Sequence, residues 1–399
     1  MDRNRNRTLI GVAVGHGAHD SWSGVAPILL ASLSVSLGLA NQDIALMMLL
    51  YQILSSVTQP FFGTLAERIG GRPLAVGSIL FTTTMFSAGL FAESKLLLGA
   101  LIFMAGLGSG AWHPQGAANA TIAGGSRWGA TAASIFFLGG SVGSAFLGSA
   151  LGGRLLANHS PRSLLVISAI TVFLALTVVR MCVPRWLNTT TKAQKKQPAA
   201  AVTRSSFWAL LVLLLIATAL RAFAQNTLNT FVPKYQQDLG VASDSYGLLV
   251  SLNTFAGAIG GVAGAYLADR VGLRRILVGT LLLGGAALYA FFHTEGMVSY
   301  VAFVVAGLLT GPSHTLLVVS GQRRFPDKMA MMSGFFLGFT FVSGAGGTWI
   351  LGLLADRYGL PQMLSYLPWA LLLAAGFAFL AVPRGAAKPA PQESEPQPA

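Results

Sequence analysis

This sequence is poor in charged residues and in cysteine, and each shortage excludes a class of protein. Only 10% of its 399 residues are charged, whereas soluble domains carry roughly 25%. A single cysteine, Cys182, excludes an intramolecular disulfide. The sequence contains no G-x-x-x-x-G-K-[ST] loop, no H-E-x-x-H and no C-x-x-C. We therefore predict neither ATP-driven pumping nor a metal site, and no cofactor of any kind.

Apolar residues and glycine are abundant instead. Hydrophobic residues make up 53% of the chain, and 47 residues are glycine, which suits close helix packing in lipid. The formal charge is +13, but the basic residues fall in short gaps between apolar runs. This pattern indicates membrane topology rather than a nucleic-acid partner.

The apolar runs predict an all-α integral membrane protein with twelve transmembrane helices, since about 20 apolar residues span a bilayer. Most of the 26 Lys and Arg lie in loops that share one side if both termini are cytoplasmic. The positive-inside rule then predicts that both termini are cytoplasmic, and we expect a multi-pass protein of the cell inner (plasma) membrane. The expected spans are 9–37, 44–64, 74–92, 96–118, 129–153, 163–183, 207–235, 245–267, 276–293, 297–320, 329–354 and 363–382.

The two halves of the sequence resemble each other. Leu65–Gly70 matches Leu267–Gly272, and the other matches follow in the same order at equivalent spans. Transporters use such repeats because two similar bundles can rock about a site between them. We predict a six-helix bundle over 1–183, a cytoplasmic linker over 184–206, a second bundle over 207–384 and a disordered tail over 385–399. The remaining matches pair Gly106–His113 with Gly307–His314, and Ser134–Gly139 with Ser333–Gly338.

The loop after the second span, Gly63–Arg72, resembles the signature loop G-x-L-A-D-R-x-G-R-R of the major facilitator superfamily. Leu267–Arg275 is a second copy, and Gly352–Gly359 is a third trace on the opposite side. In that family the loop locks the inner end of the bundle through carboxylate, arginine and helix-terminus contacts. The resemblance therefore implies a conformational gate formed by Glu67, Arg68, Arg72, Asp269, Arg270 and Arg274.

The first half resembles one branch of the superfamily more closely, the fosmidomycin-resistance branch. The matching segments are His16–Asp20, Gln52 with Gln59-Pro60, Gly106–Pro114 and Ser134–Ser144. The resemblance implies proton-driven drug export. However, the fifth span has Gly143-Ser144 where the broader efflux signature carries Gly-Pro.

Three ionisable residues share one face of the first span. His16, His19 and Asp20 stand at i, i+3 and i+4, and lipid cannot solvate that face. Burial favours the neutral form of Asp20, whereas nearby imidazoliums favour the ionised form. We therefore expect its protonation to depend on conformation and assign proton coupling to Asp20, His16 and His19. A static hydrogen bond between helices is the alternative.

Further polar residues predict a substrate cavity. His113 precedes Pro114 in the fourth span, and Arg221 lies deep in the seventh with Gln225 and Asn226 one turn on. Asn226 aligns with Asp20 across the repeat, as expected if only one half titrates. The alternatives are a kink-stabilising role for His113 and snorkelling of Arg221. The expected cavity residues are His113, Arg221, Gln52, Gln225 and Asn226.

We thus predict a secondary transporter, not an enzyme, that works by alternating access as a monomer. It would exchange protons for a small molecule such as a fosmidomycin-like compound, with the proton gradient as energy source. Import of a small organic anion, with Arg221 as clamp, is the second hypothesis. Three histidines and one aspartate leave a transition-metal substrate open, and a non-transporting sensor is an alternative of another class.

Overall fold

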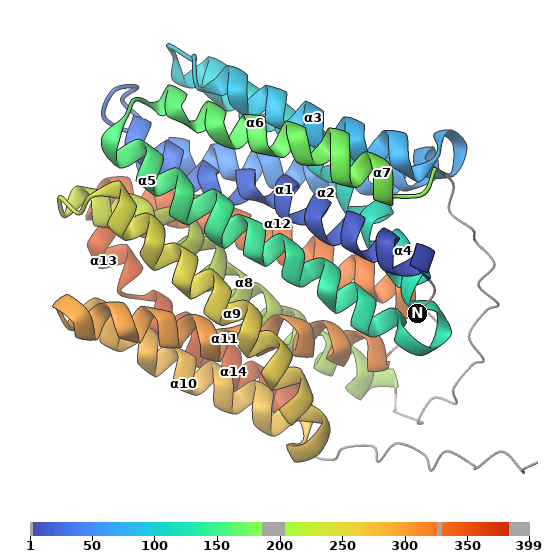
Figure 1. Ribbon diagram of the computed structural model, residues 1–399. Coiled ribbons are helices and arrows are strands. Elements are labelled where there is room, and N and C mark those ends of the chain that lie inside the picture. The colour runs from blue at the N-terminus through green and yellow to red at the C-terminus, as the bar shows by residue number, and fades with distance from the viewer. Residues whose placement is uncertain (1–2, 186–203, 325–328, 383–399) are drawn as a thin grey trace, which may run out of the picture.

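The computed structural model describes residues 3–185, 204–324 and 329–382, and throughout these ranges the regular structure is helical (Figure 1). Side chains are described for these ranges except 3, 126–130, 204–207 and 322–334. The predicted linker 184–206 lies mostly outside the described residues, and the predicted tail 385–399 lies wholly outside them.

The first half forms six helical rods. Three are single helices, and a sharp turn at Gly125 (φ 64°, ψ −163°) divides α4 into two rods, a backbone conformation that glycine adopts without a steric penalty. The fifth rod continues through a π-helical stretch, and the sixth is built from four short elements. The elements are α1 (Arg3–Leu33), α2 (Asn41–Ile69), α3 (Gly71–Gly89), α4 (Lys95–Val142), η1 (Gly143–Ala150), α5 (Leu151–Asn158), η2 (Pro161–Leu164), α6 (Leu165–Leu174), η3 (Ala175–Val179) and α7 (Arg180–Cys182).

The second half also forms six rods, the last of them built from α13 and α14. It therefore repeats the first half, as the sequence duplication predicts. The elements are α8 (Arg204–Asp238), α9 (Ser243–Val271), α10 (Leu273–His293), α11 (Gly296–Arg324), α12 (Met329–Tyr358), α13 (Leu360–Leu364) and α14 (Leu367–Ala381).

Ten of the rods in the described ranges are long and apolar enough to cross a membrane, two fewer than the twelve predicted spans. The exceptions are α1, which carries the His16–Asp20 cluster, and α3, which is rich in Ser and Thr. Trp22, Val25 and Ile28 of α1 are fully buried, so neighbouring helices rather than lipid surround this stretch. Polar residues are tolerated there because they face protein.

Glycines set the packing of the fifth rod against α1. Gly139, Gly143 and Gly148 face the α1 backbone so closely that a Cβ on Gly143 would lie 2.0 Å from the Gly17 carbonyl oxygen. Small residues on a helix face allow two backbones to approach this closely. The close approach brings α1 and α4 together, and the ionisable residues lie on these two helices.

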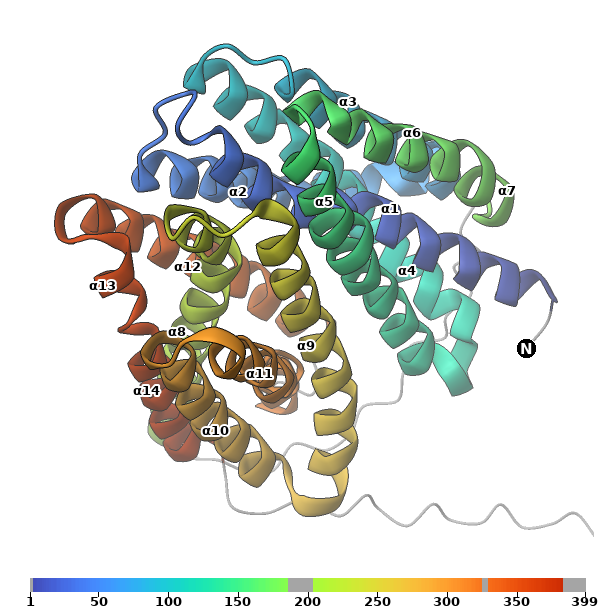
Figure 2. The same ribbon diagram turned by 60° about the vertical axis from the view of Figure 1, so that its left-hand side comes forward.

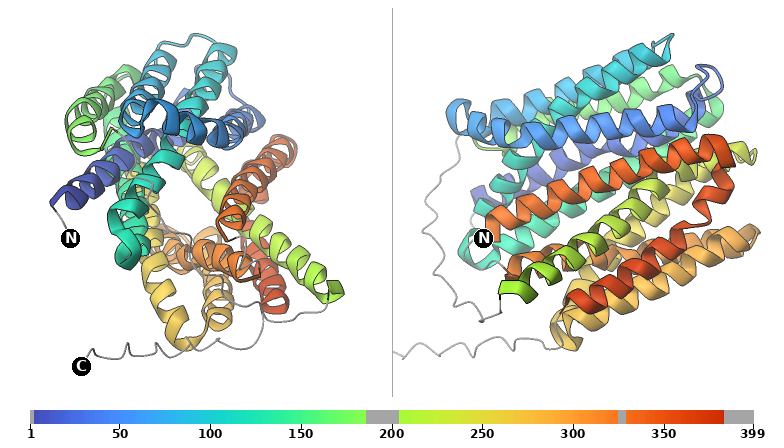
Figure 3. Two further views of the ribbon diagram at one scale, coloured as in Figure 1. Left: turned by 90° about the vertical axis from the view of Figure 1, so that its right-hand side faces the viewer. Right: turned by 180° about the vertical axis from the view of Figure 1, so that it is seen from behind.

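The two bundles meet most visibly at the end opposite the N-terminus, which we call the distal end. It carries the α1–α2, α8–α9 and α12–α13 connections (Figure 1). Figure 2 shows α5 beside α9, and the right panel of Figure 3 shows α12 beside α2. A Cβ on Gly153 would lie 2.3 Å from the Ser243 carbonyl oxygen, so α5 and α9 leave no room for a side chain between them there.

Candidate functional site

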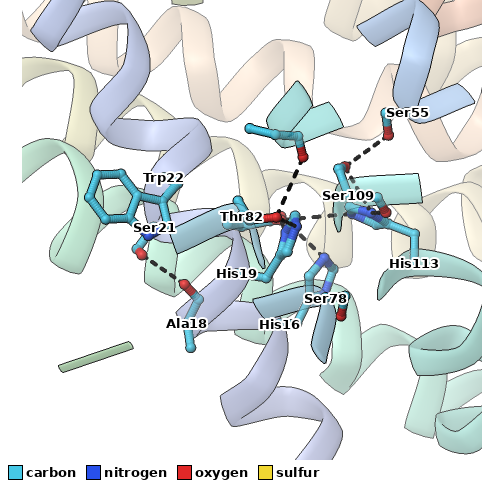
Figure 4. Close-up of polar contacts among 12 residues, drawn as sticks. His16, Ala18, His19, Ser21, Trp22, Ser55, Ser78, Thr82, Ser109 and His113 are labelled. Carbon is cyan, nitrogen blue, oxygen red and sulfur yellow. Dashed lines mark hydrogen bonds and ion pairs between the residues drawn. The ribbon is translucent and has the colours of Figure 1, made fainter. Parts of the chain in front are cut away.

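One carboxylate in the first half is surrounded by three imidazoles. Asp20 Oδ2 lies 3.1 Å from His16 Nε2, and its Oδ1 lies 2.9 Å from His19 Nδ1 and 3.7 Å from His113 Nε2. Figure 4 shows the three histidines converging from α1 and α4. The i, i+3, i+4 spacing predicts the α1 part of this cluster, and the structure also brings His113 to it.

Backbone carbonyls fix the proton positions on two of the rings. His16 Nδ1 lies 2.8 Å from the Phe136 carbonyl oxygen, and His113 Nδ1 lies 2.9 Å from that of Ser109. A carbonyl oxygen only accepts, so each Nδ1 carries the hydrogen and donates it. In a neutral ring, Nε2 then carries a lone pair and no hydrogen. Both Nε2 atoms face Asp20.

The contacts around Asp20 require an additional proton to be favourable. Neutral rings and an ionised carboxylate would place acceptor against acceptor at His16 and at His113. The buried His16 Nε2 makes no hydrogen bond within the described part of the chain, and its 3.1 Å contact with Asp20 is an ion-pair contact. A proton on His16 Nε2 or on Asp20 Oδ2 converts the 3.1 Å contact between these two atoms from repulsive to attractive.

Aromatic packing holds the rings in place. His16 stacks on Phe136 with ring centroids 3.9 Å apart, and His19 lies parallel to Trp112 at 6.2 Å. The Asp20 and His113 side chains nevertheless remain 21% and 26% accessible. Protons and water can therefore reach the carboxylate even though His16 and His19 are buried.

The second half holds a cation where the first holds an acid. Arg221 of α8 is 8% exposed, and its Nε donates to Ser313 Oγ of α11 at 2.9 Å. No carboxylate of the described residues forms an ion pair with it. Gln225 accepts from Thr310 at 3.4 Å and donates to Asn229 at 3.0 Å. Arg221 and Gln225 thus both contact α11.

The other predicted cavity residues lie apart from these contacts. Asn226 packs against α12, where a Cβ on Gly344 would meet its Nδ2 at 2.6 Å. Gln52 is half-buried in α2, and within the described ranges no hydrogen bond links it to the Asp20 cluster. Likewise, no hydrogen bond or ion pair of the described residues joins the Asp20 cluster to Arg221.

The predicted gate residues stand at the end that carries the termini. Glu67 and Asp269 are exposed, and neither has an ion pair within the described part of the chain. Their arginine neighbours contact their own half: Arg72 Nε donates to the Val183 carbonyl at 2.6 Å, and Arg274 lies 3.8 Å from the Phe379 ring centroid.

The remaining gate arginines differ from each other. Arg270 lies 4.2 Å from the Tyr266 ring centroid on its own helix, and Arg68 is exposed at the end of α2. None of these contacts joins the two halves, so the six predicted gate residues form no lock with the described residues of the other half.

Such a lock exists at the distal end. Asp356 near the end of α12 accepts hydrogen bonds from the Asn41 and Gln42 backbone N–H groups at 2.8 and 2.9 Å and from Asn41 Nδ2 at 2.9 Å. Asn41 is the first residue of α2, so a carboxylate of one half caps a helix of the other. The third trace of the loop motif, Gly352–Gly359, marks Asp356 in the sequence. It does not identify the start of α2 as the partner of Asp356.

Comparison with known proteins places the chain among transporters. The profile of the Major Facilitator Superfamily matches residues 17–237 and 214–399. The fosmidomycin resistance protein of Escherichia coli K12 is 27% identical over 365 residues, which cover 88% of this chain and 86% of that protein. The uncharacterised MFS-type transporter YfnC of Bacillus subtilis 168 is 29% identical over 365 residues, covering 90% and 88%.

Solved structures show the same fold. A bacterial homologue of the human lysosomal transporter Spinster, in an inward-facing and unoccupied conformation, superposes with a TM-score of 0.76. The match covers 96% of this chain and 97% of that one at 16% sequence identity. At this identity the likeness establishes the architecture of two six-helix bundles and nothing about substrate.

Proposed function

The chain belongs to the Major Facilitator Superfamily and is a multi-pass membrane transporter rather than an enzyme; from this premise we propose that it exports a small molecule in exchange for protons. It acts as a monomer in the cell inner membrane, with both termini in the cytoplasm and the distal end outside. The proton gradient supplies the energy.

The observation that carries this proposal is the Asp20 cluster. The Phe136 and Ser109 carbonyls hold His16 and His113 with their Nε2 atoms toward the carboxylate. The cluster therefore needs a proton to be stable in this conformation. If the carboxylate becomes hydrated when the bundles rock, its neutral neighbours matter less and the proton is released. Binding on one side and release on the other constitute coupling.

The contacts at the two ends of the molecule support alternating access as the transport mechanism. The distal contacts between Asp356 and the start of α2 close one end, while Glu67 and Asp269 at the other end have no ion pair within the described residues. A conformation closed at the opposite end would break the first set of contacts and engage the second. This is a rigid-body exchange of the kind that repeated bundles perform.

The names of the relatives support drug export. Besides the fosmidomycin resistance protein, the multidrug resistance protein MdtG of Escherichia coli 55989 is 23% identical over 351 residues. The second candidate function, import of a small organic anion, is favoured by the buried Arg221, which has no acidic partner in the described residues. Both functions use the same proton site and differ in direction.

The decisive experiment measures proton movement in liposomes that contain the purified protein and a trapped pH-sensitive dye. A fosmidomycin gradient is imposed, and wild type is compared with Asp20→Asn. Antiport predicts proton movement opposite to the substrate in wild type and none in Asp20→Asn. Asp238→Asn is the matched control, because Asp238 is an exposed carboxylate at the distal end whose one ion pair among the described residues is with Lys234.

Each other outcome removes part of the proposal. Proton movement that survives Asp20→Asn would eliminate Asp20 as the carrier. Movement in the same direction as the substrate would favour the importer. Loss of activity in Asp238→Asn as well would show that the assay reports general damage to the protein.

A further inference from the structure

Arg221 is a buried cation without a counter-charge. Its side chain is 8% exposed, and no carboxylate of the described residues lies within ion-pair distance. A charged group inside a membrane bundle is costly unless a partner compensates it. Proteins retain such a residue when the partner arrives as a ligand, or when a hydrogen bond alone holds the group for packing.

The hydrogen bonds of Arg221 occupy one edge of the guanidinium. Nε donates to Ser313 Oγ at 2.9 Å, and Ser313 Oγ in turn donates to the Thr310 carbonyl. The four remaining N–H groups make no hydrogen bond with the described residues. These nitrogens are not enclosed on all sides by the described residues, so they face accessible space.

The neighbours of Arg221 favour an anion as well. Ser313, which accepts the hydrogen bond from Arg221 Nε, is followed on α11 by the half-buried His314. Gln225, one turn further along α8, adds an amide that already contacts Thr310. The site thus combines a fixed cation with a neighbouring amide, and none of the described acids forms an ion pair with Arg221.

We infer that Arg221 binds the anionic group of the transported substrate, a carboxylate or a phosphonate, through the free N–H pairs of its guanidinium. Planar carboxylates and tetrahedral phosphonates both accept two parallel hydrogen bonds from this fork. Ser313 is the positioning residue, because its bond to Nε fixes the plane of the guanidinium. The inference rests on the proposed transport function and narrows its substrate class.

Equilibrium binding to the purified protein in detergent tests the inference without any proton movement. The probes are fosmidomycin, benzoate and inorganic phosphate, with neutral benzamide as the matched control for benzoate. We expect the wild type to bind fosmidomycin or benzoate and not benzamide. Arg221→Gln should weaken binding at least tenfold, while Arg221→Lys should lose less because it retains the charge.

Two further variants separate binding from folding. Ser313→Ala keeps the charge but removes its anchor, so we expect a loss smaller than that of Arg221→Gln. Arg357→Gln alters an arginine at the distal end that contacts only Tyr358 among the described residues, and should bind as wild type. Thermal unfolding midpoints close to wild type would confirm that the variants are folded.

The inference is overturned if Arg221→Gln, while folded, binds anions as wild type does, or if benzamide binds as tightly as benzoate. Absence of binding by all three anions would also overturn it. Its failure is distinguishable from that of the proposed function: a protein can bind anions through Arg221 and still move no protons, or move protons while Arg221 plays no part.

A second inference rests on different contacts, those of Asp356. A carboxylate beside the first N–H groups of a helix meets both unpaired donors and the positive end of the helix dipole. Here the three accepted bonds run from α12 to α2, across the two halves. We propose that Asp356 is a latch that holds the distal end closed and must release α2 when the transporter opens to that side.

Distance measurements between spin labels test the latch. One label at Leu96 and one at Met297, exposed distal positions in different halves, are introduced on a Cys182→Ser background. Asp356→Asn should increase the population of long distances several-fold. Asp244→Asn is the control, because Asp244 accepts from Ser245 within its own helix. Unchanged distances in both Asp356→Asn and Asp356→Ala would exclude the latch.

Discussion

The two halves of this transporter place opposite charges on corresponding helices. In the first half, α1 and α4 bring Asp20 together with His16 and His113. In the second half, α8 and α11 bring Arg221 together with Ser313, and Asn226 stands where the repeat aligns Asp20. A duplicated bundle has therefore kept its architecture and lost its chemical symmetry.

The difference is the basis for the proposed division of labour between the halves. An acid among imidazoles is a site for a proton, whereas an arginine without an acid is a site for an anion. If both sites face the same cavity, proton and anionic substrate neutralise opposite charges and need not compete for the same atoms. Variants that exchange features between the halves test this directly.

The largest effect is expected from moving the acid between halves. Asp20→Asn should reduce substrate-coupled proton flux on the order of 100-fold or more, because no other carboxylate of the described residues forms an ion pair with the imidazoles. The double variant Asp20→Asn/Asn226→Asp should not recover, because α8 supplies no imidazole at the new acid. The liposome dye assay measures both. Recovery in the double variant would show that the halves are interchangeable.

A smaller effect is expected on stability, at a matched pair of glycines. A Cβ on Gly139 would lie 2.3 Å from the Ala13 carbonyl oxygen, whereas its repeat partner Gly338 has nothing within 4 Å. Gly139→Ala should destabilise the protein by roughly 1–3 kcal/mol through overpacking. Gly338→Ala should be neutral or stabilising by up to about 1 kcal/mol through helix propensity.

Thermal unfolding in detergent measures the stability of the Gly139→Ala and Gly338→Ala variants. Equal midpoints for the two variants would contradict the asymmetric packing, because both sequences read Phe-Phe-Leu-Gly at this position. The comparison also checks that α1 approaches the fifth rod as closely as the structure indicates.

Hydropathy and the internal repeat sufficed to predict the fold, since both are local or periodic properties of the sequence. The spacing of His16, His19 and Asp20 on one helical turn was sufficient to group them. The hydrogen bonds that orient the rings could not be predicted, because the Phe136 carbonyl reaches His16 only through the packing of α1 on α4. Ser313 beside Arg221 depends on α8–α11 packing in the same way.

The distal lock shows the same limit. The sequence marks Gly352–Gly359 as a trace of the loop motif, yet the partner of Asp356 is the start of α2, more than half the chain away. No periodicity connects the two positions. The predicted gate residues lie in the loops where the motif places them. An inner lock formed by these residues requires a conformation different from the one described.

The smallest effect is expected from a matched pair of histidines. His113 directs Nε2 toward Asp20 at 3.7 Å, whereas His314, its repeat partner, has no carboxylate partner among the described residues. His113→Gln retains a side chain that can hydrogen bond but cannot be protonated. It should slow coupled proton flux about tenfold, equivalent to about 1.4 kcal/mol, because His16 and His19 still flank the acid.

His314→Gln should change proton flux less than about twofold, or about 0.4 kcal/mol, and act instead on anion affinity. A larger effect of His314 than of His113 on proton flux would reverse the assignment of the two halves, and would place the proton on the side of the molecule that carries the arginine.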